Sequence, residues 1–204
     1  EEHPSPLPYL IILPLFPSLL FVGHYLAEWT GYAVFSYLAF LAAFAAVPVI
    51  DETVGKDHAN FSARRFAEVN PTPFRMVLWL MGVACTVAVF AGTPLSLNLS
   101  WGRWIGHVLS TGIITGGLGI TFAHELIHKD GVDRQLGMWM LSIVCYGHFA
   151  IEHVEGHHKN VATYQDPATS RLGESIYAFL PRSIRDSYLH AWTLERENAQ
   201  RRGY

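Results

Sequence analysis

The sequence predicts an all-α integral membrane protein: a bundle of about four spanning helices, capped by a histidine-rich metal site. Half of its 204 residues are hydrophobic and only 15 % are charged. Four apolar runs are each close to the ~20 residues that cross a bilayer hydrocarbon core of ~30 Å. They cover about 8–29, 31–50, 76–96 and 103–123. Soluble domains rarely hold four such runs, so the pattern favours a membrane bundle.

The first run, 8–29, is predicted to be a span and not a signal peptide. It has no basic segment before it and no small-residue cleavage site after it. Pro8, Pro14 and Pro17 indicate a kinked or late-starting helix, which neighbouring helices can accommodate in a membrane.

Lysine and arginine predict which side of the membrane each loop faces, because they gather on the cytosolic side. The turn at Thr30–Gly31 and the loop Gly92–Gly102 have none. The loop Asp51–Arg75 has four, and Lys129 and Arg134 follow the fourth run. The four basic residues of that first charged loop are Lys56, Arg64, Arg65 and Arg75. We therefore expect the N-terminus and both charged loops to be cytosolic.

A fifth apolar run, 136–151, is predicted to be buried without crossing. Sixteen helical residues extend only ~24 Å, and this run contains Gly137, Gly147 and His148. The segment after it, 152–204, is rich in arginine and is again expected to be cytosolic. This topology keeps the two histidine-rich segments that flank the run on one side of the membrane.

Five histidines at the edge of this apolar chain predict a metal site. "HELIHK" places His124 and His128 four residues apart, so on a helix they share a face. "EHVEGHHKN" repeats that spacing with His153 and His157, and His158 follows directly. Neutral imidazole is the commonest protein metal ligand, and two such pairs directed at one place form a metal cage.

"HELIH" also matches the H-E-x-x-H pattern of zinc peptidases, which remains an alternative. One zinc needs three protein ligands and an open position, and five histidines exceed that number. Many imidazoles with few carboxylates favour two metal ions of borderline softness, such as iron. The nearby Glu125, Glu152 and Glu155 are then candidates to accept hydrogen bonds from the imidazole N–H groups. A membrane metal-binding or transport protein is a third, non-enzymatic alternative.

Other polar residues in the apolar runs have simpler interpretations. His24 and His107 are expected to pack inside the bundle, and His148 lies mostly off the face of His153. Cys85 and Cys145 are expected to be free buried thiols, because their spacing fits neither a disulfide framework nor a metal motif. The sequence has no basic stripe and no aromatic nucleic-acid motif, so nucleic acid is not an expected partner.

The two boxes, H-x3-H and H-x3-H-H, resemble those of the membrane-bound fatty-acid desaturase and hydroxylase superfamily. Within it, "HELIHK", "YGHFAIEHVEGHHKNVAT", "DPATSRLGESIY" and the closing "RRG" are similar to the alkane 1-monooxygenases, the rubredoxin-dependent alkane hydroxylases. The specific resemblance covers about Thr121–Gly203, whereas residues 1–120 agree only in hydropathy and in a turn at Pro48–Asp51. Xylene monooxygenases and fatty-acyl desaturases share the boxes but are less similar after His158.

This resemblance implies a di-iron enzyme of the bacterial cytoplasmic (inner) membrane, with its site facing the cytosol. Such an enzyme uses O2 to hydroxylate the terminal methyl group of medium and long n-alkanes, with electrons from rubredoxin and its reductase. The resemblance assigns metal binding to His124, His128, His153, His157 and His158. Five histidines cannot saturate two iron ions in the family manner, so the remaining ligands are expected beyond Tyr204. We thus expect 1–204 to be a single membrane domain, the N-terminal part of a longer polypeptide.

Three further segments carry structural expectations. Asp166 in "QDPAT" is expected to cap a helix that runs through Glu174. Segment 182–202 is expected to form a charged surface helix. Small residues on span two, Ala39, Ala42, Ala43 and Ala46, are predicted to share one helical face. That face serves either for close helix packing or as a channel for the hydrocarbon substrate.

The topology leads to a labelling prediction. A cysteine introduced at Ser96 or Asn98 should react with a membrane-impermeant maleimide added outside intact cells, because that loop is expected to be external. A cysteine at Asp133 or Asn160 should not react until the cells are opened. Opposite accessibility of Asp133 and Asn160 would mean that 136–151 crosses the membrane.

Overall fold

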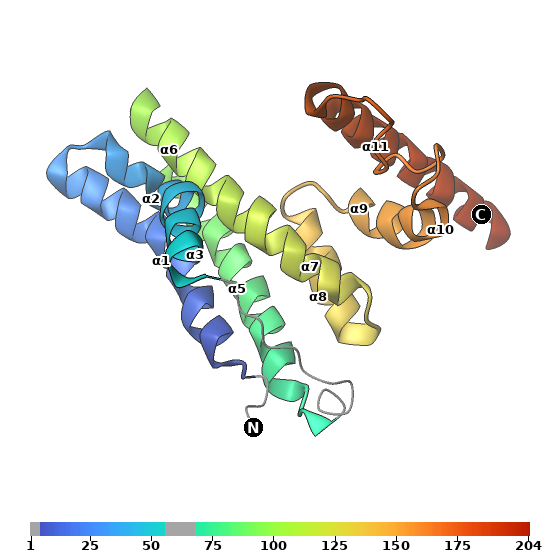
Figure 1. Ribbon diagram of the computed structural model, residues 1–204, viewed down its shortest axis with the longest axis horizontal. Helices are drawn as coiled ribbons and strands as arrows, with labels where there is room; N and C mark the ends of the chain where they lie inside the picture. The colour runs from blue at the N-terminus through green and yellow to red at the C-terminus, as the bar shows by residue number, and fades with distance from the viewer. Residues whose placement is uncertain (1–4, 56–67) are drawn as a thin grey trace. The chain divides into compact units, whose positions relative to one another are not determined.

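The computed structural model describes residues 5–55 and 68–204, and this part of the chain contains helices and no strand (Figure 1). The all-α prediction is therefore confirmed. Lys56, Arg64 and Arg65, which contribute to the predicted topology, lie outside the described residues. The chain forms two compact units, Glu1–Ala123 and His124–Tyr204, and each is described by itself.

Two helical stretches open unit one. The first, α1, covers Leu7–Thr30. It ends at Gly31, which adopts a left-handed conformation with a φ of 83°, as glycine readily does at the end of a helix. The second begins as the 3₁₀-helix η1 (Ala33–Tyr37), followed by α2 (Leu38–Leu41), the π-helix η2 (Ala42–Ala46) and α3 (Val47–Val54). Pro48 is accepted in the first turn of α3, so the predicted turn at Pro48–Asp51 is wrong.

Two longer stretches complete the unit. Helix α5 (Thr72–Leu95) begins after Pro71. Helix α6 (Trp101–Gly112), the π-helix η3 (Ile113–Gly119) and α7 (Ile120–Ile127) follow one another without a break. By length and apolar composition, three stretches of the described residues could cross a membrane: Ala33–Val54, Thr72–Leu95 and Trp101–Ile127. These overlap the second, third and fourth predicted spans over most of their length. The first predicted span lies in α1, and its crossing stays a prediction.

Small residues let the helices of unit one approach closely. Leu20 from α1, Ala39 from α2, Ala88 from α5 and Ile114 from η3 form a buried cluster. A Cβ atom at Gly23 would overlap the backbone carbonyl oxygen of Phe35. The absence of a side chain there is what allows α1 and η1 to pack.

Two histidines are buried in this unit, as predicted for packing residues. The rings of His24 and His107 meet edge to face with centroids 6.0 Å apart. Nε2 of His107 lies 3.0 Å from the carbonyl oxygen of Gly92, so the imidazole is held by a backbone group of α5.

An ion pair between Arg103 of α6 and Glu28 of α1 also joins two helices of this unit.

The alanines of span two do not share one environment. Ala39 is buried in the cluster described above, Ala42 and Ala43 are half-buried, and Ala46 is exposed. The prediction of a common face assumed an α-helical repeat throughout. The π-turn at Ala42–Ala46 bonds residue i to i+5 and therefore changes the repeat between Ala39 and Ala46.

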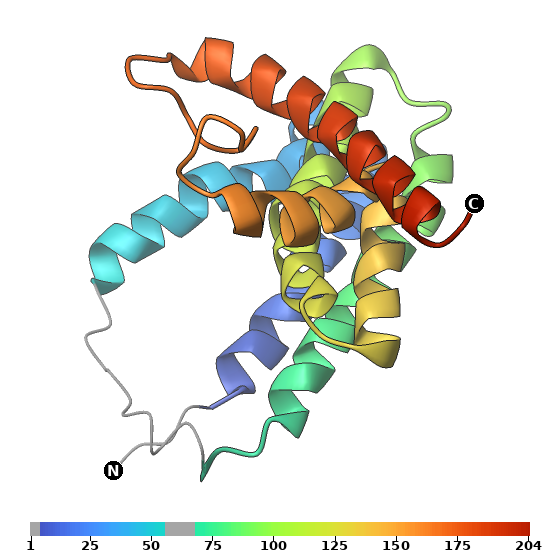
Figure 2. The same cartoon turned by 90° about the vertical axis from the view of Figure 1, so that its right-hand side faces the viewer.

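Unit two consists of several short helices and one long helix. Helix α8 (Gly131–Ser142) is followed by a turn and then by α9 (His148–Ile151), the π-helix η4 (Glu152–His157) and α10 (His158–Asn160). The long helix α11 (Ile176–Arg201) packs against α9 and η4 (Figure 2). Its N-terminus is capped by the Ser175 hydroxyl, which accepts a 3.3 Å bond from the Ala178 N–H. The predicted charged helix at 182–202 is confirmed apart from its last residue.

The segment 136–151 is broken in its middle. Helix α8 ends at Ser142, and Cys145 adopts a left-handed φ of 59° before α9 starts. Twelve helical residues extend about 18 Å, well short of a hydrocarbon core. This length supports a segment that does not cross. Cys145 is exposed, which corrects the prediction of two buried thiols, whereas Cys85 is buried as predicted.

The contact at Gly23 gives a test of the unit-one packing. Gly23→Ala should lower the free energy of unfolding by about 1–3 kcal/mol, because a backbone carbonyl cannot move aside as a flexible side chain can. Gly112→Ala is the matched control, since a Cβ there meets nothing within 4 Å. Unfolding in detergent, followed by tryptophan fluorescence, measures both. Equal stability of the two variants would show that the close approach of α1 and η1 is wrong.

Candidate metal centre

The first two histidines of the site come from the end of α7. His124 lies inside the helix and His128 follows its last residue, Ile127. Because four residues separate them, their rings lie on one face, and their Nε2 atoms are 3.3 Å apart. This pair matches the sequence prediction.

Two further histidines reach the same point from η4 and α10. Nε2 of His153 lies 2.7 Å from Nε2 of His124 and 3.2 Å from Nε2 of His128. Nε2 of His158 lies 2.9 Å from that of His153. One ring nitrogen from each of the four histidines falls within 4.8 Å of all the others. Nitrogens bound at ~2.1 Å to one tetrahedral ion would stand about 3.4 Å apart, so this spacing suits a shared metal ion.

A π-turn decides which residues of the second box converge. In an α-helix His153 and His157, four apart, would share a face, as the sequence predicts. Residues 152–157 instead form a π-helix, whose bonds join residue i to i+5. The histidine that joins His153 is therefore His158, five positions on. The ring of His157 stacks beside His153 with centroids 5.2 Å apart, but its nitrogens are not in the four-histidine group.

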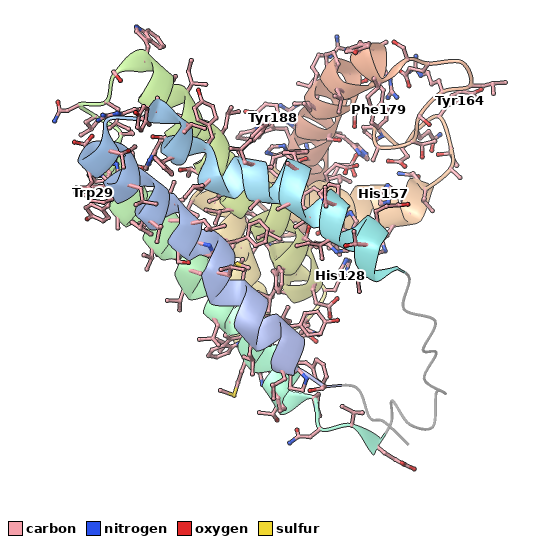
Figure 3. All side chains as sticks on the ribbon, turned by 60° about the vertical axis from the view of Figure 1, so that its left-hand side comes forward. Trp29, His128, His157, Tyr164, Phe179 and Tyr188 are labelled. Atoms are coloured by element: carbon pink, nitrogen blue, oxygen red, sulfur yellow. The ribbon has the colours of Figure 1, made fainter. Side chains whose placement is uncertain are left out.

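The side chain of His157, which is labelled in Figure 3, is held by a buried carboxylate. Its Nδ1 lies 2.9 Å from Oδ2 of Asp166, which is only 1 % exposed. Burial opposes ionisation of Asp166, but hydrogen bonds from Thr169, Ala168 and His157 outweigh it and hold the carboxyl pKa below its usual value. With Nδ1 fixed, Nε2 is the nitrogen through which His157 could bind metal.

The surroundings of Asp166 correct one prediction. Residues 167–169 form turns and not the predicted helix through Glu174. Asp166 still caps the backbone, because its Oδ1 accepts a 2.9 Å bond from the Ala168 N–H. The sequence signal for capping was thus genuine, but the same carboxylate also orients a histidine.

Two imidazoles of the group, His153 and His128, have a lowered pKa. Burial, followed by the charges of His124, His158, His157 and His128, lowers the pKa of His153 to about 4. Burial and the neighbouring imidazoles lower the pKa of His128 as well. At neutral pH these rings keep a free lone pair, and this is the form that binds a metal ion.

The three candidate glutamates have other partners. Glu125 forms a 2.8 Å ion pair with Lys129 on the surface. Glu152 lies 3.2 Å from Nδ1 of His190, and Glu155 accepts a 2.9 Å bond from Asn198. The predicted bonds from the five metal-site histidines to these glutamates are not seen within the described residues. Asp166 is the carboxylate that pairs with His157 instead.

Aromatic residues that the sequence analysis missed also support the site. The ring of Phe149 stacks on His153, with centroids 4.9 Å apart and planes 18° apart. Phe149 lies one helical turn before His153 in the sequence, and this spacing could have predicted the contact. His148 is not part of the four-histidine group. Its ring packs against Tyr146 and Tyr188, and its buried Nε2 has no hydrogen-bond partner among the described residues. Burial lowers the pKa of His148.

The donor set fits iron. Four imidazole nitrogens converge, with a fifth imidazole beside them, and imidazole suits Fe, Zn and Cu more than Mg or Ca. His124, His128, His153 and His158 would hold the first ion. His157, oriented by Asp166, is placed to serve a second.

Comparisons with known proteins agree with this chemistry. Residues 98–204 match the fatty acid desaturase family. The chain is 38 % identical over 174 residues to alkane 1-monooxygenase 2 of Pseudomonas aeruginosa, covering 82 % of this chain and 46 % of that protein. It is 38 % identical over 203 residues to alkane 1-monooxygenase of Ectopseudomonas oleovorans, covering 96 % and 50 %. With alkane 1-monooxygenase 1 of Alcanivorax borkumensis the identity is 35 % over 197 residues, covering 95 % and 48 %.

These matches extend the resemblance predicted for Thr121–Gly203. Alignments over up to 96 % of the chain include most of residues 1–120, where only similar hydropathy was expected. The chain spans about half the length of the curated relatives it matches.

The bond between His157 and Asp166 gives a prediction. Asp166→Ala should weaken Fe(II) binding about 10- to 100-fold, because the partner that orients a metal-binding imidazole is lost. Asp186→Ala, which removes a carboxylate paired with Arg185 on α11, is the control and should bind as the wild type does. Anaerobic competition with a chelator measures both affinities. Wild-type affinity in Asp166→Ala would show that the carboxylate only caps its turn.

Proposed function

The chain belongs to the fatty acid desaturase family, and from this we propose that it acts as a non-haem di-iron alkane monooxygenase. The substrates are medium- and long-chain n-alkanes, and the products are primary alcohols. The convergence of four imidazole nitrogens at the end of a 27-residue apolar helix carries this proposal. The names of the relatives support an alkane as substrate over xylene or a fatty acyl chain.

The reaction is balanced as RH + O2 + 2e⁻ + 2H⁺ → ROH + H2O. Iron, when bound, supplies O2 activation, which protein side chains cannot perform by themselves. His124, His128, His153 and His158 would hold the first iron ion. His157 would contribute to the second iron ion together with ligands other than these five histidines. We propose rubredoxin, served by its reductase, as the electron donor.

The low pKa of His153 has a role in this chemistry. An imidazole that gained a proton would leave the metal and take a proton from the reaction. Burial and neighbouring rings keep His153 neutral far below neutral pH. His153 thereby stays available as a metal ligand while the reaction consumes protons.

A saturated hydrocarbon offers no hydrogen bond, so only apolar surface and shape can guide it. Of the proposed channel residues, Ala39 is packed into the helix core and cannot line an open path. Ala43 and Ala46, which lie outside that core, remain in the proposed channel. The lipid bilayer supplies the alkane, because an alkane partitions into its hydrocarbon core.

We propose that the protein lies in the bacterial cytoplasmic membrane with its metal site facing the cytosol. The bias of lysine and arginine among the loops supports this orientation. The zinc-peptidase alternative has little support. Glu125, which would have to act as the base, is exposed and paired with Lys129, and the family match is to desaturases.

One experiment tests the proposal directly. The purified, iron-loaded full-length protein, supplied with rubredoxin, its reductase and O2, should convert n-octane to 1-octanol and should contain about two iron ions. His153→Ala should lose this activity, because it removes one of the four imidazoles that converge on the proposed iron site. Lys129→Ala changes a neighbouring exposed charge and should retain activity. Wild-type turnover in His153→Ala, or one tightly bound zinc in place of iron, would refute the proposal.

A further inference from the structure

Helix α11 is joined to η4 by a polar pair, made of a buried carboxylate and a partly buried histidine, that the proposed chemistry does not use. Glu152 is 2 % exposed, and its Oε1 lies 3.2 Å from Nδ1 of His190 on α11. Burying a carboxylate without a hydrogen-bond partner is unfavourable, so His190 stabilises Glu152 where it lies. Glu152 directly precedes His153 in the chain.

The histidine ring can reach this place because Gly156 has no side chain. A Cβ at Gly156 would stand 2.8 Å from Oε1 of Glu152 and 2.9 Å from two atoms of the His190 ring. Real Cβ atoms do not approach other atoms so closely. Gly156 directly precedes His157, so the pair and the glycine together enclose the turn that carries the second histidine box.

This turn needs support from outside. π-helices are rare and occur mostly as single turns at functional sites. An α-helical register over the same residues would place His157, and not His158, on the face of His153. The choice between the two registers therefore decides which imidazole joins His124 and His128.

We propose that Glu152, Gly156 and His190 form a clamp that holds η4 in its π-register and so positions His153 and His158 for metal. His190 and Glu152 are positioning residues, because they act through the turn and do not touch the metal. This inference rests on the proposed metal-dependent function. It assigns α11 a task in assembling the site.

A second contact between the same two elements provides an internal comparison. Oε2 of Glu155 accepts a 2.9 Å bond from Asn198, but this bond lies on the surface. Exposed hydrogen bonds contribute little, since water replaces a lost partner. Loss of the Asn198 contact should therefore leave the π-register of η4 unchanged. Loss of the Glu152–His190 contact should change it.

The test uses the full protein and Co(II) alone as the metal, because the visible spectrum of Co(II) reports its ligand geometry. His190→Leu should weaken Co(II) binding about tenfold or more and should alter that spectrum. His190→Asn, whose amide N–H can replace Nδ1–H, should restore most of both. Asn198→Ala should match the wild type. In the metal-free protein, hydrogen–deuterium exchange of residues 152–160 should be faster in His190→Leu.

If His190→Leu does not fold, Gly156→Ala provides the same test, since it keeps both polar partners and only adds a methyl group to the clamp. A wild-type Co(II) spectrum and affinity in His190→Leu, or in Gly156→Ala where the first does not fold, would overturn the clamp. So would a failure of His190→Asn to improve on His190→Leu. The variants could show the expected Co(II) changes while the iron-loaded wild type hydroxylates no alkane. That outcome would refute the proposed function and still support the clamp.

Discussion

Four imidazole nitrogens from two separate helices must meet at one point if they are to share a metal ion, and here they lie within 4.8 Å of one another. Burial, together with neighbouring imidazoles, lowers the pKa of His153 and of His128, so these two rings are uncharged at neutral pH. A metal ion shared among the lone pairs would replace water as the partner of the crowded rings. The helices of unit two are arranged to meet this condition, with each box delivering two rings from one face.

The two boxes meet the condition by different means. His124 and His128 need only an ordinary α-helix, because four residues bring them into line. His153 and His158 are five residues apart and need a π-turn, which has to be held in place. Three features surround that turn: the Glu152–His190 pair between η4 and α11, Gly156 with its missing side chain, and the stacked ring of Phe149. Asp166 orients the remaining histidine from the following loop.

Much of this could be predicted where a property belongs to a local stretch of sequence. Apolar runs predicted the long helices, and the four-residue spacing predicted the meeting of His124 with His128. The π-register of residues 152–157 was not predictable, because it depends on His190, 38 residues farther along the chain. The contact between Asp166 and His157 was also missed. The sequence around Asp166 predicts only a local capping role, and nothing in it indicates that the same carboxylate contacts a histidine nine residues earlier. The break after Ser142 and the exposure of Cys145 depend on a left-handed residue without glycine, for which the sequence has no signal.

X-ray absorption at the iron edge of the iron-loaded protein is the most direct test of the central claim, that these imidazoles converge on metal. The structure predicts a first shell dominated by nitrogen at about 2.1 Å, with the outer-shell scattering that several imidazole rings produce together. His158→Ala should reduce this imidazole contribution, whereas Lys159→Ala should leave it unchanged. A shell of oxygen atoms with one imidazole or none, or the same spectrum from the protein with and without His158, would contradict the account.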